Sequence, residues 1–173
     1  MSDDPADNKS VATLHTAELE IKWEHYGFFK IVNDVEYKLK IEDVKEDVDV
    51  KKSGIYKLIP ENRLEIYVGE AQYIFKRLND YTNAGYVPNA KREYTNRRIQ
   101  GWMYDLNKLK NEGGVKIFVC TEAFIRRSDE TKQKLDLDQK HNRLLIENLE
   151  ISITPNDFKI QNFSKYWAKN QES

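Results

Sequence analysis

The sequence predicts a small α/β domain, in which a mainly antiparallel three-stranded sheet is flanked by helices. Three short runs rich in β-branched and aromatic residues indicate the strands, at residues 54–59, 64–69 and 115–120. Apolar residues at helical spacing indicate helices over residues 72–82, 95–112 and 135–153. At 173 residues, the chain has room for one domain with appended segments.

The composition is that of a soluble domain with a core, since 39% of the residues are hydrophobic and 33% are charged. No run approaches the roughly 18 apolar residues of a membrane helix, and the first residues lack the apolar stretch of a signal peptide. A cytoplasmic location without membrane contact is therefore expected. Cys120 is the single cysteine and lies in an apolar run, so it is expected in the core. One cysteine excludes a disulfide framework and a cysteine zinc site within one chain.

An N-terminal arm is predicted over residues 16–52, after a polar, acidic tail at residues 1–15 that is expected to be disordered. Apolar and charged residues alternate around Leu19, as in a half-buried strand. Residues 28–32 and 35–42 flank an Asn-Asp turn and are typical of a hairpin. This hairpin has two interpretations. It extends the core or covers a sheet edge, or it is a recognition element for DNA or for a second copy of the chain in a homodimer.

The first two strands of the domain are expected to form a hairpin with a four-residue turn at residues 60–63. If Ile59 pairs with Leu64, then Tyr56 lies directly opposite Tyr67 on one face. The other face is expected to meet the core and carries Ile55, Ile59, Leu64, Ile66 and Val68.

A polar site is expected around these two tyrosines. Gly54 and Gly69 lie beside them and leave room for a ligand to approach the backbone. On the helix that follows, Ile74, Arg77 and Tyr81 share one row, so a guanidinium interrupts an apolar stripe. Such a group needs an anion, and a phosphate suits its planar set of donors.

The stretch from residue 76 to residue 98 has six basic residues against two acidic ones, a strong local imbalance in a chain of net charge −1. Two interpretations are open, a solvated helix face or contact with a nucleic-acid backbone. The basic residues are Lys76, Arg77, Lys91, Arg92, Arg97 and Arg98.

A buried carboxylate is predicted on the last long helix, where Leu144, Glu147 and Ile151 share a face. Burying a carboxylate is costly unless a cation or hydrogen-bond donors meet it. One interpretation pairs Glu147 with Arg143, one turn earlier. The other makes Glu147 the ligand of a hard cation, because Mg²⁺ commonly binds one carboxylate together with phosphate oxygens and waters.

These residues together resemble the GIY-YIG nuclease family. The paired motif is Gly54-Ile55-Tyr56, then ten residues, then Tyr67-Val68-Gly69. Arg77 matches the family's arginine, ten residues after the second tyrosine, and Tyr81 falls where members carry histidine or tyrosine. Glu147 matches the family's metal-binding glutamate.

The resemblance covers residues 53–156, and the tail at residues 157–173 is expected to pack on that domain. It implies a DNA endonuclease that depends on Mg²⁺ or Mn²⁺, with Arg77 on the phosphate and Tyr56 as the better candidate for the base. A stand-alone chain of this size resembles the restriction, defence or mobile-element members. The alternative is a nucleic-acid-binding module that has a nuclease fold and little or no cleavage.

The chain departs from the family pattern at two places. Glu70 follows the second half of the motif, where relatives often have lysine or a small polar residue. Its charge would either repel phosphate or supply a second carboxylate near the metal. The asparagine that often follows the proline after the last helix has two weak matches here, Asn156 and Asn162, after Pro155.

Overall fold

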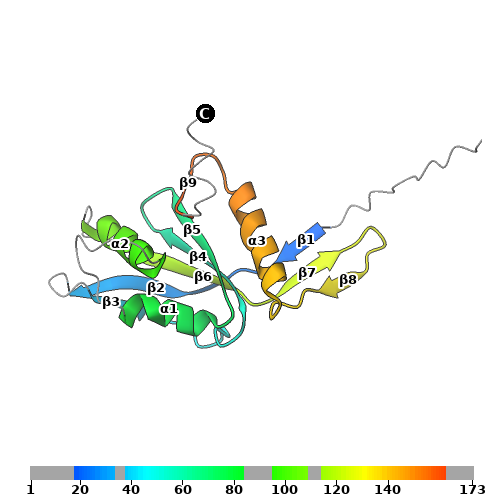
Figure 1. The fold of residues 1–173 in the computed structure, drawn as a ribbon, viewed down its shortest axis with the longest axis horizontal. Helices are drawn as coiled ribbons and strands as arrows, with labels where there is room; N and C mark the ends of the chain where they lie inside the picture. The colour runs from blue at the N-terminus through cyan, green and yellow to red at the C-terminus, as the bar shows by residue number, and fades with distance from the viewer. Residues whose placement is uncertain (1–17, 34–37, 84–94, 109–113, 163–173) are drawn as a thin grey trace, which may run out of the picture.

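A computed structural model describes residues 18–33, 38–83, 95–108 and 114–162 (Figure 1). The predicted N-terminal tail and most of the C-terminal tail lie outside these residues. The described elements, in chain order, are β1 (Glu18–Ile21), β2 (Glu24–Asn33), β3 (Lys38–Glu42), β4 (Gly54–Pro60), β5 (Glu65–Ala71), α1 (Ile74–Asn83), α2 (Thr95–Lys108), β6 (Val115–Cys120), β7 (Ala123–Arg126), β8 (Lys132–Lys134), α3 (Lys140–Ile153) and β9 (Lys159–Ile160).

In the described part of the chain, the main sheet has six strands in the order β3-β2-β6-β4-β5-β9. Neighbouring strands are antiparallel except β5 and β9, which are parallel. The three predicted strands β4, β5 and β6 are neighbours within it, and Cys120 is buried as expected. The predicted three-stranded sheet was too small, because β2 pairs with β6 and adds the N-terminal hairpin to the sheet. The protein is therefore of mixed α/β class.

The N-terminal hairpin of β2 and β3 belongs to the core. Phe29 pairs with Ile41 in its ladder, and Ile31 pairs with Leu39. Phe29 is fully buried and Leu39 is 2% exposed, on the face that also holds the tyrosines of the candidate site. The hairpin thus extends the core, which is the first of its two interpretations.

The register of the hairpin formed by β4 and β5 differs from the predicted one. Tyr56 lies opposite Gly69, and Tyr67 lies opposite Leu58, so the two tyrosines are diagonal neighbours. The prediction was wrong because β4 continues through Pro60 along β6, which moves the turn on by one residue. Side chains alternate with a period of two, so both tyrosines still share a face. Leu64 falls in the turn and is 53% exposed instead of facing the core.

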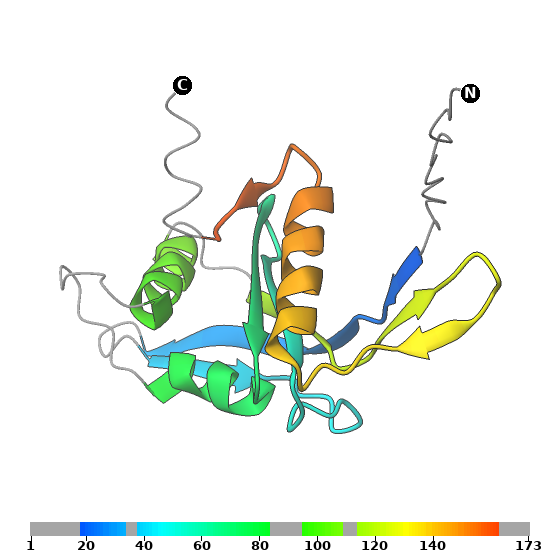
Figure 2. The same cartoon turned by 45° about the vertical axis from the view of Figure 1, so that its right-hand side comes forward.

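The two faces of the main sheet carry separate groups of buried side chains. Tyr56 and Tyr67 belong to one face, together with Leu78 of α1. Val68 belongs to the other face, together with Ile146 of α3, which runs alongside β5 (Figure 2). Fully burying an aliphatic side chain of this size contributes about 1.5–3 kcal/mol. Helices packed on opposite faces therefore both reach the strand that carries Tyr67.

A second, three-stranded sheet in the order β1-β7-β8 lies beside the main one (Figure 1). Residues 123–134 form the hairpin of β7 and β8, although the sequence of this charged segment did not indicate strands. Leu19 pairs with Ile125, so the alternating apolar residues of β1 and β7 cover each other. The positive φ of Glu130 (63°) lies in the turn between β7 and β8.

The helices begin and end within a few residues of the predicted limits, with one larger difference. The helix predicted from residue 135 begins at Lys140, because Leu135 and Leu137 are buried in an extended segment. The amide of Leu135 donates to the carbonyl of Ala123 at 2.8 Å. Among the described helices, none has both the length and the apolar character that crossing a membrane requires.

Candidate active site

A cavity of about 280 Å³ lies where β5, α1 and α3 meet, and it collects residues from both faces of the sheet. β9 pairs with β5 at Glu65 and Ile66, so the later residues of β5 lie at the edge of the sheet. This position lets side chains from both faces reach one space. The described lining residues are Tyr56, Tyr67, Glu70, Arg77, Tyr81, Lys140, Leu144 and Glu147, which include all five side chains that the sequence suggested for catalysis.

The three phenols of the cavity form a connected group. The hydroxyl oxygens of Tyr56 and Tyr81 are 2.7 Å apart and share a hydrogen bond. The ring centroids of Tyr56 and Tyr67 are 6.0 Å apart. Tyr56 is paired with Gly69 in the ladder of β4 and β5, and a Cβ at this glycine would lie 2.5 Å from Cζ of the Tyr56 ring. The space beside Gly69 is therefore filled by Tyr56, so the expectation that a ligand approaches the backbone there was wrong.

The ionisation of the phenols is governed by burial. Burial raises the pKa of Tyr56 and of Tyr81 well above the ordinary value of 10. It also raises the pKa of Tyr67, although the positive charge of Arg77 acts in the opposite direction on all three phenols. The nearby cation therefore does not produce a phenolate at neutral pH. In this state, the tyrosines can donate hydrogen bonds, and a role as general base would need a further change in their surroundings.

Arg77 reaches the cavity from the flank of α1. On that helix Ile74 and Leu78 are fully buried and Tyr81 is 1% exposed, so they fix the face that packs on the sheet. Arg77 lies beside this face, half-buried, as the predicted helical row requires. Its guanidinium is close enough to all three phenols to influence their pKa values.

Glu147 is a partly buried carboxyl on α3 with an unusual environment. Burial and the neighbouring carboxylate of Glu70 raise the pKa of Glu147 to about 7. The alternative that paired it with Arg143 was wrong, because Arg143 instead donates from Nε to Oε2 of Glu70 at 2.7 Å. Among the described residues, no lysine or arginine forms an ion pair with Glu147. Its charge therefore lacks a protein counter-ion in this part of the chain.

Asn162 is the site residue that the sequence identified least clearly. Its Nδ2 donates to the carbonyl of Val68 at 2.5 Å, and the amide of Val68 donates to its Oδ1 at 2.9 Å. Nδ2 also lies 3.4 Å from Oε1 of Glu147. Asn162 thus continues the pairing of β9 along β5 and places its amide beside the carboxyl. Asn156 lies in the turn after α3 instead. The two candidates therefore differ in position, because Asn162 lies just beyond β9.

The basic residues proposed for nucleic-acid contact are only partly described. Lys76 is exposed on α1, and Arg98 is partly exposed on α2. Lys91, Arg92 and the side chain of Arg97 lie outside the described residues. A further basic residue, Lys140, lines the cavity from the first turn of α3. The sequence did not single it out, because its distance from the motif conceals its place in the fold.

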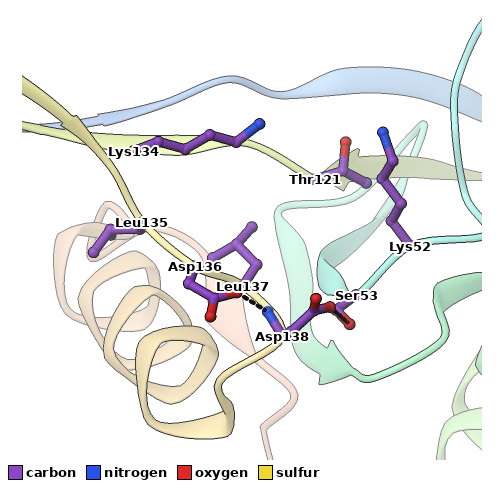
Figure 3. A pocket seen from close by; sticks show the side chains of 8 residues that line it. All are labelled: Lys52, Ser53, Thr121, Lys134, Leu135, Asp136, Leu137 and Asp138. Carbon is purple, nitrogen blue, oxygen red and sulfur yellow. Dashed lines mark hydrogen bonds between the residues drawn. The ribbon is translucent and has the colours of Figure 1, made fainter.

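A larger cavity of about 470 Å³ is lined in part by the segment that leads into α3 (Figure 3). Its polar groups are largely paired with one another or with near neighbours. Ser53 Oγ donates to Oδ1 of Asp138 at 2.7 Å, and Oδ1 of Asp136 accepts the amide of Asp138 at 3.0 Å. Lys134 pairs with Glu122 at 2.6 Å. The smaller cavity is therefore the better candidate, because it holds the carboxyl without a counter-ion.

The fit of a metal ion rests on Glu147. No cluster of three or more histidine, cysteine, aspartate or glutamate side chains suited to a metal occurs among the described residues. A hard cation such as Mg²⁺ does not require one, since it commonly takes one or two carboxylates and completes its shell with phosphate oxygens and waters. A partly buried carboxyl with a raised pKa and no ion pair suits such an ion, because the cation would offset the cost of its charge.

Comparison of the chain with protein-family models, with curated proteins and with solved structures gives no match. The resemblance to the GIY-YIG family therefore rests on the residues and spacings of this sequence. The geometry of the cavity is an independent observation, because it depends on the fold and not on the motif.

Proposed function

We propose that this protein is a metal-dependent DNA endonuclease of the GIY-YIG type, which hydrolyses phosphodiester bonds. The observation that carries the proposal is the meeting of Tyr56, Tyr67, Arg77 and Glu147 in one cavity. These residues come from β4, β5, α1 and α3, and no local packing rule requires them to share a space. On the basis of the resemblance, we assign the protein to the restriction, defence or mobile-element members. We propose, separately, that it acts in the cytoplasm.

Glu147, in the middle of α3, would hold the metal ion, Mg²⁺ or Mn²⁺. When bound, such an ion polarises a phosphate and stabilises the leaving oxygen as a Lewis acid. Asn162 is placed to orient the carboxyl, because its amide is fixed by the backbone of Val68. The metal requires the ionised carboxyl, so its affinity should rise as the pH rises through about 7.

Arg77 would hold the non-bridging oxygens of the phosphate, where negative charge develops during hydrolysis. Its planar guanidinium offers two parallel donors to a phosphate. Tyr56 and Tyr81 stay protonated and share a hydrogen bond, so they form a fixed polar wall. Tyr67 is the most exposed of the three, at 7%, and is the phenol best placed to orient an attacking water.

The charge of Glu70 is the argument for the alternative, a binding module without cleavage, and the structure weakens it. Glu70 would repel a phosphate if its charge were unopposed. Arg143 pairs with this carboxylate at 2.7 Å, so a phosphate entering the cavity meets a neutralised pair. The intact set of Tyr56, Arg77 and Glu147 favours the enzyme.

The direct test is incubation of the purified protein with supercoiled plasmid DNA, in Mg²⁺, in Mn²⁺ and in EDTA. We expect conversion to nicked or linear DNA in either metal and none in EDTA. Gel-shift measurements in EDTA separate binding from cutting. DNA binding without cleavage in either metal would support the binding module, and absence of both would reject the proposed function.

A further inference from the structure

A largely buried ion pair lies next to the candidate active site. Arg143 is 4% exposed, and its Nε donates to Oε2 of Glu70 at 2.7 Å. Its Nη1 donates to the backbone carbonyls of Leu137 and Asp138, at 2.7 and 2.9 Å. One guanidinium thus joins the end of β5 to the segment that leads into α3. The described lining of the cavity includes Glu70 but not Arg143.

The charges around the cavity give this pair a role beyond packing. Two carboxyls, Glu70 and Glu147, line the same space, and Glu70 is the charged group that acts on Glu147. Arg143 neutralises Glu70, whereas Glu147 has no ion pair among the described residues. Two unopposed carboxylates would attract cations strongly and repel a phosphate. With one of them neutralised, the cavity carries a single free anionic site.

A second ion pair on α3 provides a comparison within the same molecule. Lys57 of β4 pairs with Glu150, and Trp23 Nε1 donates to Oε1 of Glu150 at 3.1 Å. This pair also holds α3 to the sheet, and the Glu150 residue is 6% exposed. Neither member lines the cavity. The two pairs therefore share a structural role and differ in their position relative to the site.

We infer that Arg143 is the charge-balancing residue of the candidate active site. By neutralising Glu70, it lets the cavity accept a DNA phosphate together with one divalent cation. The inference rests on the proposed function, since it concerns the ligands of that site. It assigns to Arg143 an effect on ligand affinity that a residue holding only the helix would not have.

The two single variants are expected to shift affinities in opposite directions. Arg143→Gln leaves two free carboxylates, so Mn²⁺ should bind more tightly, on the order of tenfold, and a short DNA duplex more weakly. Glu70→Gln leaves an unpaired guanidinium, so Mn²⁺ should bind more weakly and the duplex more tightly by similar factors. The double variant should lie near the wild type in both affinities. A loosened helix would instead lower both affinities in both variants.

The measurement is a titration of the protein with Mn²⁺ alone, in which free Mn²⁺ is detected by its electron paramagnetic resonance signal. Duplex binding is measured separately in EDTA. Circular dichroism identifies the variants that fold. Lys57→Met is the matched control, which should lower the melting temperature and leave Mn²⁺ affinity unchanged. If Arg143→Gln does not fold, Glu70→Gln decides, because its Mn²⁺ affinity must fall while its duplex affinity rises.

Shifts of the same sign in the two single variants would overturn the inference, as would a Lys57→Met effect on Mn²⁺ affinity as large as that of Arg143→Gln. If the variants gave these results while the wild-type protein bound Mn²⁺ and cleaved plasmid, the proposed function would still stand. A wild-type protein that neither binds Mn²⁺ nor cleaves would contradict both proposals together.

Discussion

Arg77 is the residue whose chemistry is easiest to isolate. Arg77→Lys retains the charge and removes the planar pair of donors, so the phosphate loses its bidentate partner. Because Arg77 flanks the packed face of α1, stability should change little. We expect cleavage to fall on the order of 100-fold, the usual cost of losing one such transition-state contact of about 3 kcal/mol. Plasmid nicking rates measure the first effect and thermal melts the second. A lysine variant that cuts at the wild-type rate would limit Arg77 to a structural role.

Glu147 links the site to the stability of the fold. Its pKa, raised from 4.5 to about 7 by burial and by Glu70, means that folding takes up a proton between these pH values. Stability from this group is thus present at low pH and is lost as the pH rises through that window. Glu147→Gln stays neutral, so it should raise the free energy of unfolding near pH 8 by about 1 kcal/mol, allowing for partial exposure. Urea unfolding near pH 5 and near pH 8, in EDTA, measures the difference.

The same variant also addresses the metal. Excess Mg²⁺ should stabilise the wild type near pH 8 and leave Glu147→Gln unaffected, because the variant lacks the charged ligand. Cleavage should disappear in the variant while duplex binding persists. Wild-type cleavage by Glu147→Gln would remove the carboxyl from the proposed mechanism.

The individual residues differ in how far the sequence could identify them. The two tyrosines, Arg77 and Glu147 lie within or near recognisable patterns, and the fold brings their side chains into one cavity. Lys140 and the partner of Glu70 could not be found in this way, because each depends on how α3 approaches β5. Long-range packing decides such contacts, and spacing along the chain does not encode them.

The hairpin of β4 and β5 makes its own prediction at the scale of the element. Gly69→Ala places a Cβ where the Tyr56 ring lies, 2.5 Å from Cζ, so the ring must move. Overpacking of this kind costs about 1–3 kcal/mol and should also disturb the hydrogen bond to Tyr81. Urea unfolding of Gly69→Ala measures the cost. In a double-mutant cycle with Tyr56→Leu, which removes the clashing ring atoms, part of that cost should be recovered. Additive losses would show that the clash is not the cause.

The elements show where prediction from sequence ends. The three central strands were located correctly because apolar and β-branched residues are concentrated in them. The predicted register was wrong because the turn lies one residue later than expected. The pairing of Pro60 with Val115 lengthens β4, and no local sequence pattern reveals this pairing. The hairpin at residues 123–134 was missed because its apolar partner, β1, lies about a hundred positions earlier in the chain. Each failure concerns a partner that is distant in sequence.

The whole molecule depends on its N-terminal segment. Removing residues 1–45 deletes β1, β2 and β3, takes Phe29 out of the core and leaves β6 without one of its two neighbouring strands. We therefore expect this truncation to abolish cooperative unfolding, and removal of residues 1–17, which retains β1, to preserve it. Circular dichroism and thermal melts of both proteins make the comparison. A folded protein that lacks residues 1–45 would show that the hairpin is dispensable to the core.

The order of the cavity's residues along the chain has a consequence for protein synthesis. The ribosome releases Tyr56, Tyr67 and Arg77 early, while Glu147 and Asn162 follow about seventy or more positions later. A nascent or prematurely terminated chain that ends before Glu147 has the phenols and the guanidinium but lacks the proposed metal ligand. If the protein cleaves DNA as proposed, fragments left by aborted translation should be harmless to the cell's own DNA, and cleavage should arise together with the finished fold.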